Sequence, residues 1–187
     1  TDGTRPVVTL TAADALPGVT SLSPALQEER YLLFNDAVKV LRQNPQASVY
    51  IDAGYGKWVP VKEMAERLKK AGVEHASGFA LNTSNYRTTE ESIAYGKELS
   101  ALVGGKHFVI DTSRNGAGPY EGAKSITEMW CNPPGRKIGL PPTTETGEPL
   151  IDGYLWLKRP GESDGECERG EPKAGVFWLE QAREYAK

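Results

Sequence analysis

The stretch SVYIDAGYGKWVPVKEMAERLKKAGVEHASGFALN, residues 48–82, holds the repeating unit from which the fold of this chain can be inferred. It begins with a short apolar run, Ser48–Gly54, which is typical of a buried strand. The next segment carries apolar residues at helical spacing and ends at Gly72: Val61, Met64, Ala65 and Leu68. A second apolar run, Ser77–Asn82, follows. The stretch therefore predicts a strand, a helix and a second strand in succession.

The same alternation extends in both directions along the chain. Further strands are predicted at Arg5–Thr11, His107–Ser113 and Tyr154–Lys158. Further helices are predicted from Pro24 to about Asn44, from Thr88 to about Val103, and over Val176–Ala186. Ser23 before Pro24, and Thr88 with Glu91 three residues later, are helix-start signals. This order favours a single parallel α/β domain over residues 1–187, built either as a barrel or as a doubly wound sheet.

Composition narrows the function classes. The chain has 187 residues, of which 39% are hydrophobic and 25% charged. This fits a globular domain that is large enough to bury a hydrophobic core. The formal net charge is −3, and no run of Lys or Arg is long enough to indicate nucleic-acid binding. The apolar stretches are too short for a membrane span. No signal peptide is visible, and Thr1-Asp2-Gly3 resembles an end left by cleavage or trimming.

Polar side chains follow every predicted strand. They are Asp14, Asp52, Asn82 with Asn85, Asp111, and the group from Lys158 to Asp164. Ligand sites of parallel α/β folds lie at the carboxyl ends of the strands, so these residues are expected to share one site. The segment Gly116–Asp152 is rich in Gly, Pro and Thr, and such long loops are usually functional.

The available chemistry is that of carboxylates. The chain has no glycine-rich phosphate loop and no Gly-x-Ser-x-Gly nucleophile turn, and its two histidines lack metal-ligand spacing. Paired carboxylates at strand ends suit glycoside hydrolysis, in which one group acts as acid and one as base. Asp52 and Asp111 could equally cap backbone amides or pair with an arginine such as Arg114.

Aromatic and sulfur-containing residues add two open questions. Trp58 and Trp130 stand in loops, where an indole can stack on a sugar ring or simply seal the rim of the fold. Trp156 and Trp178 fall within a predicted strand and helix and are expected in the core. Cys131 and Cys167, both in loop sequence, are compatible with a disulfide and equally with two free thiols.

Six stretches, in chain order, carry a resemblance to a known family. They are VYIDAGYGKW, GFALNTSNY, FVIDTSRNGAGP, WCNPPGRKIGLPPT, DGYLWLKRPGESDG and AGVFWLEQA. Together they resemble glycoside hydrolase family 6, the inverting endoglucanases and cellobiohydrolases that act on β-1,4-glucans. The resemblance runs from about Arg5 to the C-terminus. It implies a distorted parallel TIM-like barrel, a secreted enzyme, β-1,4-glucan as the partner, and neither a cofactor nor a metal ion.

The resemblance also implies roles for particular residues. Asp164 matches the catalytic base, which acts on water directly or through a chain of waters. Asp14 matches the aspartate of the family's Glu-Pro-Asp stretch, which supports the acid site. The matched sugar-binding positions are Lys158, Glu162, Trp58, Trp130 and either Asn82 or Asn85, with both tryptophans as stacking platforms on the leaving-group side. Cys131 and Cys167 match a family disulfide that would tie the long loop to the loop of Asp164.

The sequence departs from the family pattern at three places. The family's first strands carry the general-acid aspartate in a Tyr-Asp-x-Pro-like motif, together with a tryptophan platform, and neither motif is present here. Ala12-Ala13 replaces the Glu-Pro of the Glu-Pro-Asp stretch, and Tyr55 replaces a usual histidine. We therefore expect a barrel that is incomplete at its N-terminal strands, the C-terminal part of a larger catalytic domain whose general acid lies upstream.

Two alternatives remain open. The chain could be a non-catalytic glucan-binding module of the same ancestry, which the changes at Ala12-Ala13 and Tyr55 would explain. It could also be an unrelated α/β enzyme that uses Asp52 and Asp111, although the six ordered stretches would then be accidental.

Overall fold

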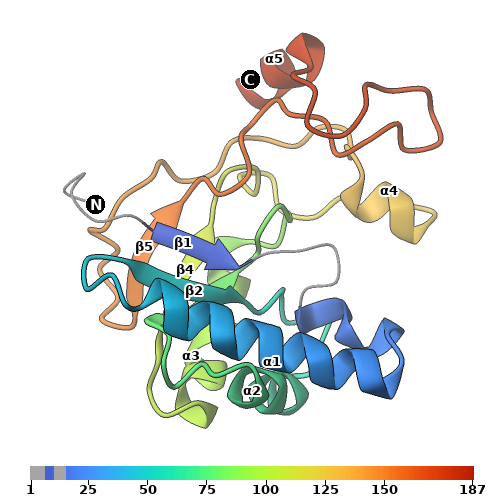
Figure 1. The fold of residues 1–187 in the computed structure, drawn as a ribbon. Coiled ribbons are helices and arrows are strands. Elements are labelled where there is room, and N and C mark those ends of the chain that lie inside the picture. The colour runs from blue at the N-terminus through green and yellow to red at the C-terminus, as the bar shows by residue number, and fades with distance from the viewer. Residues whose placement is uncertain (1–6, 11–15) are drawn as a thin grey trace.

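The fold is built around one parallel sheet whose strands follow the order of the chain (Figure 1). The computed structural model describes residues 7–10 and 16–187. The strands are β1 (Val7–Leu10), β2 (Ser48–Asp52), β3 (Gly78–Leu81), β4 (His107–Asp111) and β5 (Ile151–Leu155). Each strand pairs with the next in parallel, and β1 and β5 lie at the two edges.

The helices follow the strands in the order that the sequence predicts. They are α1 (Pro24–Leu41), α2 (Val61–Lys70), α3 (Thr89–Leu102) and α5 (Leu179–Tyr185), with a short α4 (Ile126–Trp130) inside the long loop and a 3₁₀ helix at Leu16–Ser21. The Ser23 hydroxyl accepts a hydrogen bond from the Leu26 N–H, and Thr88 and Glu91 form the predicted capping box. Neither α4 nor the 3₁₀ helix was predicted, because each is too short to show a helical period. Strand β5 also begins three residues earlier than predicted.

The three long helices α1, α2 and α3 cover one face of the sheet. Parallel strands in chain order need crossovers of one hand, so α1, α2 and α3 lie together on one face, while the long loops with α4 and α5 lie on the other (Figure 1). Side chains alternate accordingly. Val49, Ile51 and Phe79 point into the large core under the helices, whereas Tyr50 and Ala80 belong to a small cluster on the opposite face.

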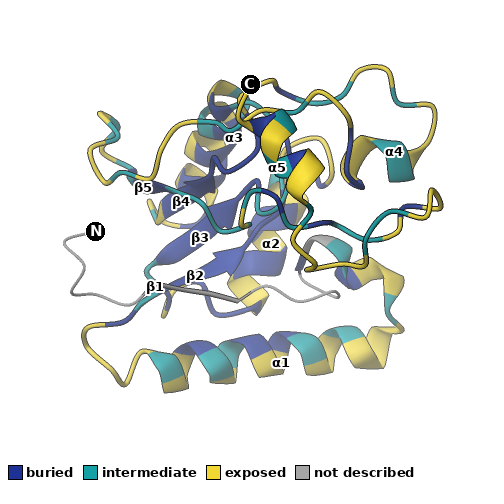
Figure 2. Ribbon diagram, turned by 90° about the horizontal axis from the view of Figure 1, so that it is seen from above, coloured by how far each residue is buried: buried dark blue, intermediate teal, exposed yellow. Residues whose placement is uncertain are grey.

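The carboxyl ends of the strands therefore converge beneath the long loops. These ends and the loop segments that follow β3 and β4 are among the buried parts of the molecule (Figure 2). Burial of polar loop segments requires that their groups be paired with one another. This edge of the sheet is where the predicted site residues can meet.

Candidate active site

Asp164 lies on the loop that follows β5, and the turn before it is fixed by glycine. Gly161 has φ +91°, and a Cβ atom added there would lie 2.8 Å from the Ala182 Cβ of α5. The Trp178 N–H donates to the Gly161 carbonyl at 2.7 Å, so the loop is held against the start of α5. Only a residue without a side chain fits this close, left-handed turn.

The Asp164 carboxylate is buried and is held by three groups from distant parts of the chain and by Lys158 from its own loop. Arg114 Nη1 donates to both oxygens, at 2.9 Å to Oδ1 and 2.8 Å to Oδ2. The Tyr86 hydroxyl and the Asn132 N–H donate to Oδ2 at 3.2 and 3.1 Å. Lys158 Nζ lies 3.5 Å from Oδ1. The structure thus brings together the predicted base and one predicted sugar-binding residue, Lys158.

Arg114 supplies the main positive charge beside Asp164. Its side chain is fully buried, lies 4.5 Å from the centre of the Tyr86 ring and also donates to the Ser84 carbonyl. The Tyr86 hydroxyl lies 3.4 Å from that of Tyr185 on α5. Burial raises the pKa of Tyr86 and of Tyr185, so both hydroxyls keep their protons near neutral pH. Removing either member of such a buried ion pair would leave the other charge buried without its partner, which strongly destabilises a fold.

Asp52 and Asp111 support the backbone at the ends of β2 and β4. The Asp52 Oδ1 accepts from the Gly54 N–H at 2.8 Å, while Asp111 accepts from the N–H groups of Ser84, Ser113 and Lys158. Burial raises the pKa of Asp52 to about 7, with a further contribution from the Asp111 charge, and burial also raises the pKa of Asp111. Of the two supporting roles expected for these aspartates, the capping of amides is the one observed, since Arg114 pairs with Asp164 instead.

Lys158 and Glu162 lie at the start of the same loop. Lys158 Nζ donates to the Ser163 carbonyl at 3.3 Å, and its side chain is 15% exposed. Glu162 is equally buried and forms an ion pair with Arg159, a side chain that is 80% exposed. Both charged groups are near Asp164 in the chain, and their sugar-binding roles remain predictions.

The two asparagines after β3 differ in exposure. Asn82 is fully buried with φ +62°, and its amide bonds to the backbone of Arg87 and to the Asp111 carbonyl. It therefore fixes the loop that carries Tyr86. Asn85 is partly exposed and accepts from the Tyr86 N–H through its side chain. Of these two alternatives for a sugar contact, Asn85 has the more accessible side chain.

The exposure of the four tryptophans differs in part from the prediction. Trp58 and Trp130 are 52% and 44% exposed, so each offers an indole face on which a ring could stack. Trp156 and Trp178, expected in the core, are partly exposed. That expectation was wrong because β5 ends at Leu155 and α5 begins at Leu179, which leaves both indoles just outside a regular element.

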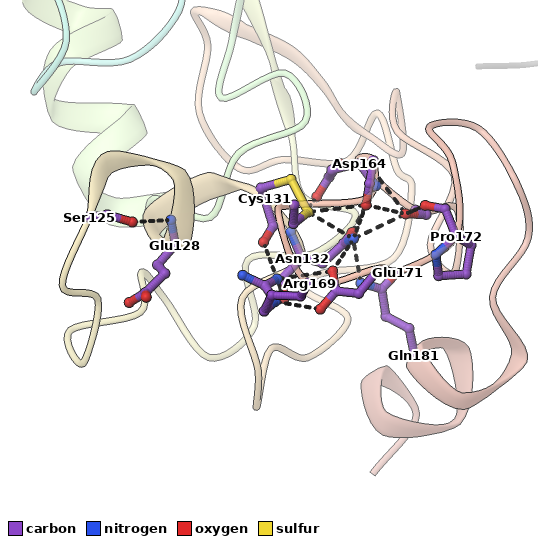
Figure 3. The surroundings of a disulfide bond; sticks show 12 residues. Ser125, Glu128, Cys131, Asn132, Asp164, Arg169, Glu171, Pro172 and Gln181 are labelled. Atoms are coloured by element: carbon purple, nitrogen blue, oxygen red, sulfur yellow. Dashed lines mark hydrogen bonds and ion pairs between the residues drawn. A yellow bond between two sulfur atoms is a disulfide. The ribbon is translucent and has the colours of Figure 1, made fainter.

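The predicted disulfide is present and joins the loop after α4 to the loop of Asp164 (Figure 3). Cys131 and Cys167 are bonded with a Cα–Cα distance of 5.7 Å. Next to it, the Asn132 side chain bonds to Ser163, Gly165 and Glu171. Asn132, Tyr86, Arg114 and Tyr185 were not identified as site residues from the sequence, although all but Tyr185 stand within the stretches that carry the family resemblance.

Asp14, the second predicted catalytic residue, lies outside the described residues, and so do Ala12 and Ala13. Within residues 7–10 and 16–187, no group of three His, Cys, Asp or Glu side chains could hold a metal ion. In the same ranges no helix is long and apolar enough to cross a membrane.

Comparison with known proteins gives a consistent result. The model of the family described as "Glycosyl hydrolases family 6" matches residues 7–187. Endoglucanase A of Thermobispora bispora is 46% identical over 187 residues, covering 97% of this chain and 39% of its own length. Endoglucanase A of Cellulomonas fimi is 51% identical over 141 residues, covering 75% of this chain and 30% of its own length.

A solved structure shows the same fold. The endoglucanase of Mycobacterium tuberculosis, in complex with methyl-cellobiosyl-4-deoxy-4-thio-β-D-cellobioside, superposes with a TM-score of 0.92 at 49% identity. The match covers 97% of this chain and 61% of that one, so the chain spans less than two thirds of its relatives. The expected fold class, the distorted parallel TIM-like barrel, is confirmed by this likeness.

Proposed function

The chain belongs to glycosyl hydrolases family 6, and on that premise we propose that it takes part in hydrolysis of β-1,4-glucosidic bonds in cellulose or related β-glucans, with inversion of configuration. The observation that carries the proposal is the Asp164 cluster, in which a carboxylate lies at the carboxyl edge of the sheet among Arg114, Lys158 and Tyr86. Strand topology supports this position, because ligand sites of parallel α/β folds lie at the carboxyl ends of the strands.

In this proposal Asp164 is the base. An inverting hydrolase uses one carboxylate to take a proton from water as the water oxygen attacks the anomeric carbon. A second carboxyl group, about 6.5–9.5 Å away, protonates the departing glycosidic oxygen. Arg114 donates to both oxygens of the Asp164 carboxylate, and Lys158 Nζ lies 3.5 Å from Oδ1, so two cations contact the proposed base.

The general acid is proposed to come from residues upstream of β1, with Asp14 supporting it. Asp52 and Asp111 are poor candidates because both are buried and engaged by backbone amides. A further segment of the same domain is supported by the surface of α1, on which Leu26, Leu33 and Val40 are about half exposed and recur every seven residues. A neighbouring helix of a completed barrel would cover this stripe.

Substrate binding is proposed to use the exposed indoles and polar side chains of the loops that follow β3 and β5. Trp58 and Trp130 would stack on glucose rings, while Lys158, Glu162 and Asn85 would meet the hydroxyls. The disulfide supports a protein that matures in an oxidising compartment, and we propose that it is secreted.

The test is release of reducing sugars from soluble cellulose, measured for this chain and for the chain extended by the residues encoded upstream. Changing Asp164→Asn in whichever form is active should lower the rate by about 100- to 10,000-fold, the usual contribution of general base catalysis. Asp152→Asn is the matched control. Its carboxylate is also paired, with Tyr50 and His107, but it lies at the amino end of β5. Full activity of the Asp164 variant would refute the base assignment.

A second candidate, a glucan-binding module without catalysis, is favoured by the replacements at Ala12-Ala13 and Tyr55. It predicts that cello-oligosaccharides quench tryptophan fluorescence while the extended chain releases no sugar. Absence of both binding and turnover would contradict both candidates.

A further inference from the structure

Asn132 is the most heavily bonded side chain near Asp164 (Figure 3). It follows Cys131 of the disulfide, is 5% exposed and has φ +46°, a left-handed conformation that asparagine tolerates better than most residues. Its Nδ2, which carries two hydrogens, shares them among Ser163 Oγ, the Gly165 carbonyl and Glu171 Oε2 at 2.8–3.0 Å. All three acceptors belong to the loop that carries Asp164.

The contact between Asn132 and Asp164 is reciprocal. The Asp164 N–H donates to Asn132 Oδ1 at 2.8 Å, and the Asn132 N–H donates to Asp164 Oδ2 at 3.1 Å. One bond fixes the backbone of Asp164 and the other fixes its carboxylate. Together they restrict both the position of the residue and the rotation of its side chain.

The two oxygens of the Asp164 carboxylate differ in the number of hydrogen-bond donors that they contact. A carboxylate oxygen has about two lone-pair sites. Oδ2 already accepts from Arg114, Tyr86 and the Asn132 N–H, so it has no capacity left. Oδ1 accepts one bond from Arg114 at 2.9 Å, with Lys158 at the longer distance of 3.5 Å. Oδ1 is therefore the oxygen that retains room for another donor.

We propose that Asn132 is a positioning residue for the hydrolytic reaction, which orients Asp164 so that Oδ1 is the atom that accepts the proton of the attacking water. The inference rests on the proposed role of Asp164 as base. In the reaction step the water O–H bond breaks and its proton passes to Oδ1. The water oxygen then forms its bond to the anomeric carbon while the glycosidic oxygen leaves with the proton of the acid.

The direct test is Asn132→Gly in the form of the protein that is active on soluble cellulose. Glycine keeps the backbone N–H and accepts φ +46° without strain, so only the side-chain bonds are lost. The kcat is expected to fall at least tenfold. Both KM and the dissociation constant for cello-oligosaccharides, measured by tryptophan fluorescence, are expected to stay within about twofold, because Asn132 orients the base rather than the substrate.

Val38→Ala is the control for loss of stability alone. Val38 is fully buried on α1, in the core on the helix-covered face of the sheet. This variant should lower the melting temperature while leaving kcat unchanged. If Asn132→Gly does not fold, the pair Asn132→Asp with Glu171→Gln serves instead. It keeps an acceptor for the Asp164 N–H and reverses the bond to residue 171, and it should recover more kcat than Asn132→Asp alone.

The outcomes separate the two proposals. An inactive Asp164→Asn with an unchanged kcat for Asn132→Gly would overturn the role of Asn132 alone. Full activity of Asp164→Asn, or no turnover in any form of the protein, would overturn the base assignment and the role of Asn132 with it. A rise in KM with an unchanged kcat would show that Asn132 acts on substrate binding and would likewise overturn the inference.

Discussion

Replacing Asp52 by asparagine should remove most of a pH dependence that the buried carboxyl group imposes on folding stability. Asp52 ends β2 and is 9% exposed, and burial raises its pKa from 3.8 to about 7. In the unfolded chain the carboxyl group returns to water and to its ordinary pKa. Between pH 4 and pH 7 the folded state therefore holds a proton that the unfolded state has released.

The sign and the size follow from proton linkage. Because the folded state binds more protons in this range, the free energy of unfolding falls as pH rises, and the fall ends above pH 7. At about 1.4 kcal/mol per pH unit, the difference between the two pKa values corresponds to about 4 kcal/mol. The raised pKa of Asp111 acts in the same direction.

Urea unfolding at pH 5 and pH 8 measures this effect. From pH 5 to pH 8 the free energy of unfolding of the unaltered chain should fall by several kcal/mol. That of the Asp52→Asn variant should fall much less, since an amide can still accept the Gly54 N–H but does not titrate. Asp36→Asn, on the exposed side of α1, is the matched control and should behave like the unaltered chain. An equal loss in the Asp52 variant and the control would refute the reasoning.

Two further predictions concern the site loops. Arg114→Met should destabilise the fold by about 3–5 kcal/mol, because it leaves the Asp164 carboxylate buried without its main cation. In a double-mutant cycle measured by urea unfolding, adding Asp164→Asn should restore part of that loss, and strictly additive effects would contradict the pairing. Replacing Cys131 and Cys167 by alanine should cost about 4 kcal/mol through the unfolded state, given the sequence separation of 36. The same replacement should leave the secondary structure intact by circular dichroism, and an unchanged melting temperature would show that the crosslink constrains nothing.

The regular elements were largely predictable from sequence. Strand β2 and helix α3 each show their signal within a few neighbouring residues, as an apolar run and as a capping box. The elements that were missed or misplaced, such as α4 and the start of β5, are short or irregular, and β5 pairs with β4 across a bulge near Val109. A bulge depends on the partner strand, which local sequence does not specify.

The candidate site was predictable only in part. Asp164, Lys158 and the pair of cysteines could be singled out, because they stand in stretches that resemble a known family. The partners of Asp164 could not be assigned, since Arg114, Tyr86 and Asn132 lie 50, 78 and 32 residues away in the chain. Asn82 illustrates the same limit. The resemblance implies a sugar contact for Asn82 or Asn85, and only the fold shows that Asn82 is buried and supports the loop that carries Tyr86.

The sequence by itself determined the order of strands and helices and, through six stretches that resemble a known family, the family. It also predicted a site at the carboxyl edge of the sheet. The order of strands and helices depends on periodicity, which acts between near neighbours, whereas the family depends on the residues of those six stretches. The tertiary structure decided which cation pairs with Asp164, which carboxyls are buried at the ends of β2 and β4, and which oxygen of Asp164 keeps room for another donor. Those outcomes depend on desolvation and on contacts between distant segments, and only the folded chain brings such segments together.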